Sequence, residues 1–328
     1  MRSTLPVENR IESPPKRERR RPSLRRGLGA ALALLVCGSF LAAAQDYPAA
    51  PPSPYKVDAR LAWDRRALLI RVTFNLAAAG LRLPEGRLEA ERQIERDLPG
   101  LAKDAVFSLQ VDSYRTVSDT VMDGSLDPEE LIALAKEARQ IGSSFSRDMK
   151  ELAASFEFPL DAIGALYVRH NQASPAPAAL EWTPSRPHTG IVIVAQGVFP
   201  VHGEGVSDHL QPCLFPRVFD SGMRLLLDRE AVDPDVLRAR GEVGYASTVA
   251  YDERVGDDPL LVMASQIFGT DRTDLVIPRE DALAILDLPA NRELLREGRV
   301  TIVIDPGSLT GLPASGVQRA APTQAQSP

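Results

Sequence analysis

The densest group of side chains that could carry chemistry lies between His202 and Cys213. Two imidazoles and a thiol, from His202, His209 and Cys213, are donors that Zn²⁺ and similar ions prefer in proteins. Glu204 and Asp208 add carboxylates to the same stretch. The sequence therefore predicts a metal site with His202, His209 and Cys213 as its ligands.

The same stretch, 202–213, also has a simpler interpretation. Its spacing matches no closed zinc motif, and Gly203 and Gly205 favour an exposed polar loop between strands. In this interpretation Cys213 packs as a small apolar residue at the start of a strand. The sequence leaves both interpretations open.

No pattern typical of an enzyme accompanies this stretch. There is no Gly-x-Ser-x-Gly motif, and Ser207 stands too close in sequence to Asp208 and His209 to form a catalytic triad with them. The glycines are not followed by the Gly-Lys-Ser/Thr of a phosphate-binding loop. Asp257 and Asp258 precede a proline and are typical of a turn rather than of paired glycosidase acids. We therefore predict that the protein is not an enzyme and uses no cofactor.

The elements that would position the metal site form the second of two predicted domains. A Pro-rich segment at 173–187 without periodicity predicts a linker between a first domain at 55–172 and a second domain at 188–305. Strands and helices are mixed rather than regularly alternating, which favours an α+β fold with two small mixed domains. The Pro-rich segment 45–54 predicts an extended spacer, and 306–328 predicts a disordered tail.

Apolar spacing predicts the elements of the first domain. Alternating apolar residues over 55–63 and a run rich in β-branched residues over 67–76 predict two strands joined by a short turn. The spacing over 85–111 predicts a helix that breaks or kinks at Pro99. The pair Asp127-Pro128 predicts the start of a further helix, which continues to about residue 140.

In the second domain, two fully apolar runs predict strands that are buried on both faces. These runs are 190–195 and 300–304. The other predicted elements lie between these runs, with strands at 213–219, 241–246, 260–267 and 275–277, and helices at 280–286 and 292–297.

Residues 1–44 predict export from the cytoplasm. A dense positive block at 16–26 precedes an apolar run of about 14 residues, which is too short to span a bilayer comfortably and suits the core of a signal peptide. Ala42-Ala43-Ala44 then supplies the small residues that a signal peptidase needs. Cys37 lies inside the apolar run without a small residue before it, so a lipid anchor is not predicted.

The charge that remains after cleavage limits the partners of the protein. The whole chain has a net charge of −6 and residues 1–44 carry nine basic and three acidic residues, so the remaining residues carry −12. Such an acidic chain is a poor candidate for binding nucleic acid. We predict a periplasmic protein that contacts the membrane only through its signal peptide or an uncleaved anchor.

The second domain also contains a series of sequence segments that can be compared with known proteins. These segments are Thr189–Gly197, Pro212–Asp220, Gly241–Ala246, Val255–Ala264, Asp274–Ala282 and Gly298–Asp305. Over roughly 187–305 the chain resembles exported bacterial proteins grouped with LPP20-type lipoproteins and flagellar-associated outer-membrane proteins. It is also similar to uncharacterised exported proteins of spirochaetes.

The resemblance implies a non-catalytic role in the cell envelope, in some members around the flagellar motor. The implied partners are envelope or flagellar proteins, including further copies of the same chain, and the resemblance brings no catalytic residue. We therefore expect a structural or assembly role. The alternative is a periplasmic ligand- or metal-binding module that uses the loop 202–213.

Overall fold

The computed structural model describes residues 53–311 apart from 137, 180 and 182. The predicted signal peptide at 1–44 lies outside the described residues, as do most of the predicted spacer 45–54 and residues 312–328 of the predicted tail. None of the described helices combines the length and the apolar character that a membrane crossing requires.

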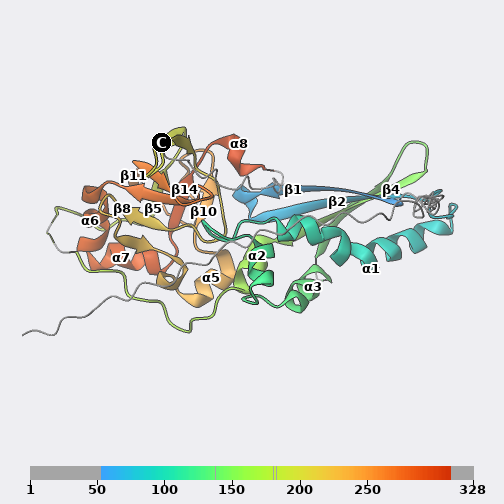
Figure 1. Ribbon diagram of the computed structural model, residues 1–328, viewed down its shortest axis with the longest axis horizontal. Helices are drawn as coiled ribbons and strands as arrows, with labels where there is room; N and C mark the ends of the chain where they lie inside the picture. The colour runs from blue at the N-terminus through green and yellow to red at the C-terminus, as the bar shows by residue number, and fades with distance from the viewer. Residues whose placement is uncertain (1–52, 137, 180, 182, 312–328) are drawn as a thin grey trace, which may run out of the picture. The chain divides into compact units, whose positions relative to one another are not determined.

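The first part of the described chain is an antiparallel sheet with one face covered by a long helix, α1 (Gly86–Phe107). Figure 1 shows α1 running beside the sheet. Alternate side chains of the second strand, such as Ile70 and Phe74, are buried, and so are Ile94 and Leu98 of the helix. The strand order is β1 (Tyr55–Ala62), β2 (Ala67–Asn75), β4 (Glu151–Pro159) and β3 (Arg139–Phe145).

Two strands were predicted at the start of this domain, and β1 and β2 confirm them. A break or a kink was predicted at Pro99, and the break is wrong, because α1 continues through this residue. Burial of Leu98 and Ala102 against the core offsets the cost of one missing backbone hydrogen bond. Tertiary packing here overrides the local preference of proline.

Three short helices complete this part of the chain, namely α2 (Val117–Met122), α3 (Pro128–Lys136) and α4 (Leu160–Ala165). Asp127 accepts a hydrogen bond from the backbone N–H of Glu129 at 2.9 Å, as expected for the predicted helix start. The predicted helix end near 140 is wrong, because Arg139 already belongs to β3 and pairs with Glu157 of β4.

The second part of the described chain contains two four-stranded sheets. The first is entirely parallel, and its inner strands β14 and β5 are nearly or fully buried, which agrees with the predicted pair of apolar strands. Its order is β10 (Gly244–Ala246), β14 (Val300–Val303), β5 (Ile191–Val194) and β11 (Leu260–Met263).

The second of these sheets is mixed, with β13 parallel to β8 and the outer pairs antiparallel. The run predicted as one strand at 260–267 is divided between the two sheets, because the chain turns at Ala264 and Ser265. The order is β12 (Gln266–Phe268), β13 (Asp274–Ile277), β8 (Val218–Asp220) and β9 (Leu225–Leu227).

A hairpin and several helices surround these sheets. The predicted helices near 280–286 and 292–297 are confirmed as α6 (Arg279–Asp287) and α7 (Pro289–Arg296). Elements that were not predicted include the hairpin strands β6 (Val198–Pro200) and β7 (Ser207–His209), the 3₁₀ helix η2 (Arg229–Ala231) and α5 (Pro234–Arg240). The mixture of helices and sheets confirms the α+β fold class.

The first residues of the predicted tail 306–328 are folded, so this part of the prediction is wrong. Residues 306–309 form a short helix, α8 (Pro306–Leu309), and Leu309 is buried in the core. The backbone N–H of Leu61 in β1 also donates a hydrogen bond to the carbonyl of Gly311 at 3.1 Å. The segment from 306 to 311 is therefore part of the folded structure, because an apolar side chain and a backbone carbonyl anchor it.

The described residues of the predicted linker 173–187 form no helix or strand, but they are attached to the second sheet region. Ser185 donates a hydrogen bond to the carbonyl of Ala284 at 2.8 Å, and Asn291 donates one to the carbonyl of Arg186 at 3.0 Å. Ala176 and Ala179 pack against the core. This segment follows the surface of the second domain instead of spanning open space.

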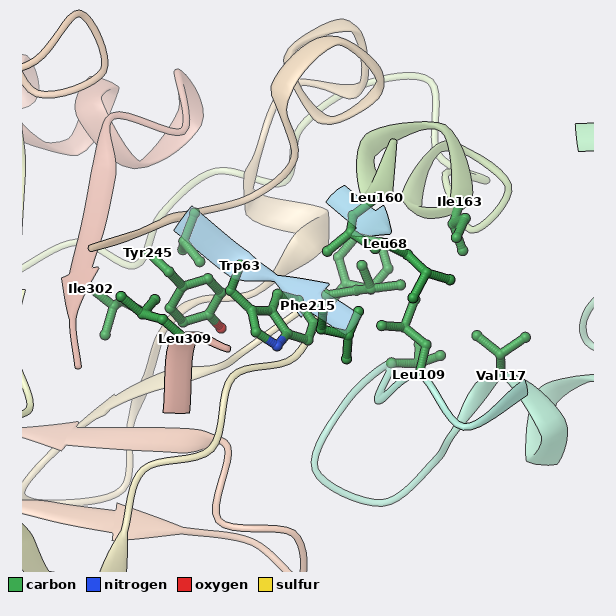
Figure 2. Close-up of a cluster of buried hydrophobic side chains, with 14 of the residues drawn as sticks. Trp63, Leu68, Leu109, Val117, Leu160, Ile163, Phe215, Tyr245, Ile302 and Leu309 are labelled. Atoms are coloured by element: carbon green, nitrogen blue, oxygen red, sulfur yellow. The ribbon is translucent and has the colours of Figure 1, made fainter. Parts of the chain in front are cut away.

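The first and second sheet regions share one hydrophobic core. Trp63, in the 3₁₀ helix η1 (Trp63–Arg65) after β1, packs edge-on against Tyr245 of β10 with ring centroids 5.6 Å apart. Figure 2 shows Trp63 between Tyr245 and Phe215. Beside it, Arg66 donates a hydrogen bond to the carbonyl of Val243 at 2.7 Å. Apolar and polar contacts thus join the two regions at the same point.

Candidate functional site

The two histidines of the predicted metal site lie on and beside the hairpin of β6 and β7, each with a different partner. His202 Nδ1 is 2.7 Å from Gln266 Oε1. His209 Nδ1 is 2.8 Å from Asp305 Oδ2, a carboxylate that also accepts a hydrogen bond from the backbone of Gly197. The two imidazoles are therefore engaged in separate contacts of the hairpin.

Cys213, the third predicted ligand, is fully buried. Its backbone N–H and carbonyl both hydrogen-bond to the hydroxyl of Tyr245, at 3.2 and 3.0 Å. Burial raises the pKa of the Cys213 thiol well above its ordinary value, which disfavours the thiolate that binds metals.

The carboxylates of this stretch are also engaged, because Arg272 forms ion pairs with Glu204 at 2.8 Å and with Asp208 at 3.8 Å. Within the described part of the chain, no group of three or more His, Cys, Asp and Glu side chains is placed to hold a metal ion. The structure therefore gives His202, His209 and Cys213 no common centre. The sequence identified suitable donors, but their partners in the fold separate them.

A different site lies where residues 110–116 of the first domain meet residues 213–230 of the second. It is a pocket of about 360 Å³ whose walls come from both domains. Its lining combines three arginines, two aromatic rings and three carboxylates, namely Arg115, Arg217, Arg229, Tyr114, Phe215, Asp112, Asp228 and Glu230.

The first wall of the pocket is a turn fixed by Asp112. One oxygen of this carboxylate accepts the backbone N–H groups of Tyr114 and Arg115, at 3.0 and 3.1 Å. The other oxygen accepts Nη2 and Nε of Arg115, at 2.6 and 3.0 Å. A single β-bridge between Gln110 and Thr116 closes the turn. The Arg115 guanidinium is thus held in one orientation, and Asp112 raises its pKa.

This turn is attached directly to the second domain. The backbone N–H groups of Leu214 and Phe215 donate hydrogen bonds to the carbonyls of Gln110 and Val111, at 3.1 and 2.9 Å. The side chain of Gln110 donates to Asp271 at 2.8 Å. Because backbone hydrogen bonds connect the two domains here, the turn 110–116 is fixed relative to the wall of the pocket that the second domain provides.

Arg217 forms the base of the pocket, just before β8. Its Nη2 and Nε donate to Asp274, a fully buried carboxylate, at 2.6 and 3.0 Å. Its guanidinium lies 5.2 Å from the ring centroid of Tyr114 and 5.4 Å from that of Phe219. Burial alone would lower the pKa of Arg217, but the Asp274 carboxylate outweighs burial and holds that pKa above its ordinary value. Arg217 is therefore a fixed positive charge.

Arg229 differs from Arg115 and Arg217 because no carboxylate of the described residues holds its guanidinium. It belongs to η2, whose first turn is capped by Asp228 through hydrogen bonds from the backbone N–H groups of Glu230 and Ala231. Its guanidinium lies 5.6 Å from the ring centroid of Phe215. Among the described residues it has neither a hydrogen bond nor an ion pair within 4.0 Å. A guanidinium of this kind, supported on an aromatic ring, can bind a carboxylate or phosphate through two parallel hydrogen bonds.

The buried Glu242 adds an electrostatic influence near the pocket. Both of its carboxylate oxygens lack a hydrogen-bond partner, and the residue is completely buried. Burial raises its pKa well above the ordinary value, and Asp228 and Asp274 raise it further, whereas Arg229 lowers it. The Glu242 carboxyl group therefore stays protonated up to a higher pH than that of an exposed glutamate.

The pocket can therefore bind an anionic group through Arg229. Of the described residues that line it, none is a Ser, Thr, Cys, His or Lys. Asp112 is engaged by Arg115, and Asp228 caps η2. The sequence analysis missed this site, because Arg115, Arg217 and Arg229 follow no motif and only the fold brings their two segments together.

Two family models, both named after domains of one protein, match the chain. Residues 54–166 match the family model of the N-terminal domain of Treponema pallidum Tp0624, and residues 190–306 match that of its second domain. No curated protein matches the chain. The predicted similarity to spirochaete proteins is confirmed and extends to the first domain, while neither match is to an LPP20-type or flagellar protein. Each match contributes one wall of the pocket.

Proposed function

We propose that this chain, which carries both Tp0624 domain types in order, is an exported, non-catalytic protein of the bacterial cell envelope that assembles with other envelope proteins. The basic and apolar leader at 1–44 supports export to the periplasm. The resemblance of residues 187–305 to LPP20-type and flagellar-associated proteins makes components around the flagellar motor the first partners to test. Further copies of the chain are the second.

The observation that carries this proposal is the unpaired guanidinium of Arg229 in a pocket built by both domains. Arginine and tyrosine are the residues most often responsible for binding energy at protein interfaces. Arg229 is half-buried and rests on Phe215, while Tyr114 is 46% exposed at the same pocket. This arrangement suits an acidic side chain or a terminal carboxylate of a partner protein.

The remaining charges of the pocket support binding rather than catalysis. Arg115 and Arg217 each donate two hydrogen bonds to one oxygen of a structural carboxylate, so their positions are fixed before a partner arrives. A preorganised site loses less conformational entropy on binding. The same contacts commit Asp112 and Asp274 to structural roles, so neither is free for acid–base chemistry.

A photo-crosslinking residue placed at Tyr114 tests the proposal in cells that export the full chain. We expect crosslinks from position 114 to one or a few envelope proteins, or to a second copy of the chain. The matched control is position 251, where Tyr251 is 65% exposed but does not line the pocket. Crosslinks from position 251 to the same proteins, or none from position 114, would contradict the proposal.

A further inference from the structure

A second pocket, separate from the arginine site, lies between α1 and α3. Its volume is about 390 Å³, within the range of small-molecule sites. Nearly all of its lining is apolar or small, namely Pro99, Gly100, Ala102, Lys103, Val106, Phe107, Val121, Pro128, Leu131, Ile132 and Ala135. We refer to these residues as the helical groove.

Small side chains keep the helical groove open. Ala102, Leu131 and Ala135 form a buried floor, and Ile132 is 46% exposed at its edge. Gly100 lies in the middle of α1, where a Cβ would meet no heavy atom within 4 Å. Glycine in a helix interior costs about 0.5–1 kcal/mol relative to alanine, so its presence at this wall leaves space without helping the helix.

The only charged residue of the helical groove is Lys103. Its ammonium lies 5.2 Å from the ring centroid of Phe107, and it has no carboxylate within 4.0 Å in the part of the chain that the structure describes. No acidic residue lines the groove. An apolar channel with one uncompensated cation is complementary to a ligand with an apolar chain and a single negative head.

We propose that the helical groove binds a free medium-chain fatty acid, with its chain on the apolar floor and its carboxylate at Lys103. One cation and a volume of this size fit one chain with one carboxylate. The proposal does not rest on the proposed function, because no residue of the helical groove lines the arginine pocket. Each can fail without the other.

The roles of the ligand's carboxylate and of its hydrocarbon tail can be tested separately. Calorimetric titration of the full exported protein measures the affinity for each ligand. Each buried methylene strengthens binding about fourfold, so decanoate should bind about 15-fold more tightly than octanoate. Decyltrimethylammonium, with the same chain and the opposite charge, should bind at least several-fold more weakly than decanoate. Concentrations stay below the micelle threshold of each compound.

Two variants locate the binding site. Gly100→Leu fills the groove at a helical position and should abolish decanoate binding while the thermal transition of the protein persists. Lys103→Gln should weaken decanoate binding several-fold and leave decyltrimethylammonium unaffected or stronger. The control is Lys136→Gln, which removes an exposed lysine of α3 outside the groove and should change neither.

Three results would overturn the proposal. One is the absence of decanoate binding to the unmodified chain. Another is equal binding of decanoate and decyltrimethylammonium, which would remove the role of Lys103. The third is unchanged decanoate binding by the folded Gly100→Leu variant. This result would show that decanoate does not bind in the helical groove, and an apolar segment of a partner protein would then be its expected occupant.

Discussion

Glu242 shows how strongly the interior of this protein acts on a single carboxyl group. It has no exposed surface, and no described residue donates a hydrogen bond to either of its oxygens. Burial therefore raises its pKa, and the carboxyl group is neutral in the folded protein over a wider pH range than in the unfolded chain. Its contribution to stability is fully present below the unfolded pKa of about 4.3 and is lost as pH rises through the folded pKa.

The variant Glu242→Gln keeps the shape of the side chain and cannot ionise. We expect this variant to have a higher free energy of unfolding than the unmodified protein at pH 8. The gain is about 1.4 kcal/mol for each pH unit by which burial raises the pKa of Glu242. It cannot exceed the value that corresponds to the difference between pH 8 and the unfolded pKa. The difference should shrink towards pH 4. Urea denaturation at several pH values measures it, with exposed Glu253→Gln as the control that should show no such trend.

At this same scale the sequence identified residue types but not their partners. His202, His209 and Cys213 are suitable metal donors, and their clustering within one short loop made them a reasonable prediction. Hydrogen bonds to Gln266 and Asp305 come from segments far along the chain. No local pattern encodes those contacts, so the distance between the donors could not be predicted.

At the scale of elements, α2 controls how the turn 110–116 ends. Thr116 is its N-cap, and its side chain accepts the backbone N–H of Asp119 while the Asp119 carboxylate accepts the backbone N–H of Thr116. This capping box satisfies two donors at the start of the helix. It also fixes the exit of the chain from the turn that carries Asp112 and Arg115.

Thr116→Ala should therefore destabilise the protein by about 1 kcal/mol, the usual cost of losing an N-cap. Chemical denaturation measures the change in the free energy of unfolding. Ser118→Ala, two residues further along the chain in α2 and without a capping hydrogen bond, is the matched control and should be neutral or slightly stabilising. Equal effects of the two substitutions would refute the capping role.

The elements with clear local signals were predicted well, and those defined by tertiary pairing were not. The alternation in β1, the β-branched residues of β2 and the Asp127-Pro128 start of α3 are local properties of the chain. The strand β3 is almost fully exposed, so it has no apolar period, and pairing with β4 alone makes it a strand. The short β9 and α5 carry too few residues to establish a period.

At the scale of the whole described molecule, Trp63 joins the cores of the two domains. It is 3% exposed and packs against Tyr245, while Arg66 next to it reaches the backbone of the second domain. Figure 2 shows the side chains on both sides of Trp63. The arginine pocket lies at the same junction, so its geometry depends on this joint.

Trp63→Ala should cost about 3–5 kcal/mol, the range for truncating a large buried aromatic residue. The melting temperature should fall, and the first and second domains should separate into two transitions or become more sensitive to protease near the linker 173–187. Differential scanning calorimetry and limited proteolysis measure this. The control is Tyr251→Ala, which truncates an exposed aromatic residue. If Trp63→Ala and Tyr251→Ala gave identical calorimetric profiles, the claim that Trp63 joins the two domains would be contradicted.

The site also belongs to this scale, which explains why it could not be predicted. Its walls come from segments around Arg115 and Arg229, which lie in different domains of the chain. The sequence could indicate that there are two α+β domains and where the buried strands lie. It could not indicate that the turn 110–116 would hydrogen-bond to residues 214 and 215.

The most direct test of the central claim is crosslinking from position 114 in two charge-matched variants, Arg229→Glu and Arg238→Glu. Both change the net charge equally, and Arg238 is an exposed residue of α5 outside the pocket. We predict that Arg229→Glu loses the envelope partner while Arg238→Glu retains it, with both variants folded and exported. Equal retention of the partner by both variants would contradict a role for the arginine pocket in assembly.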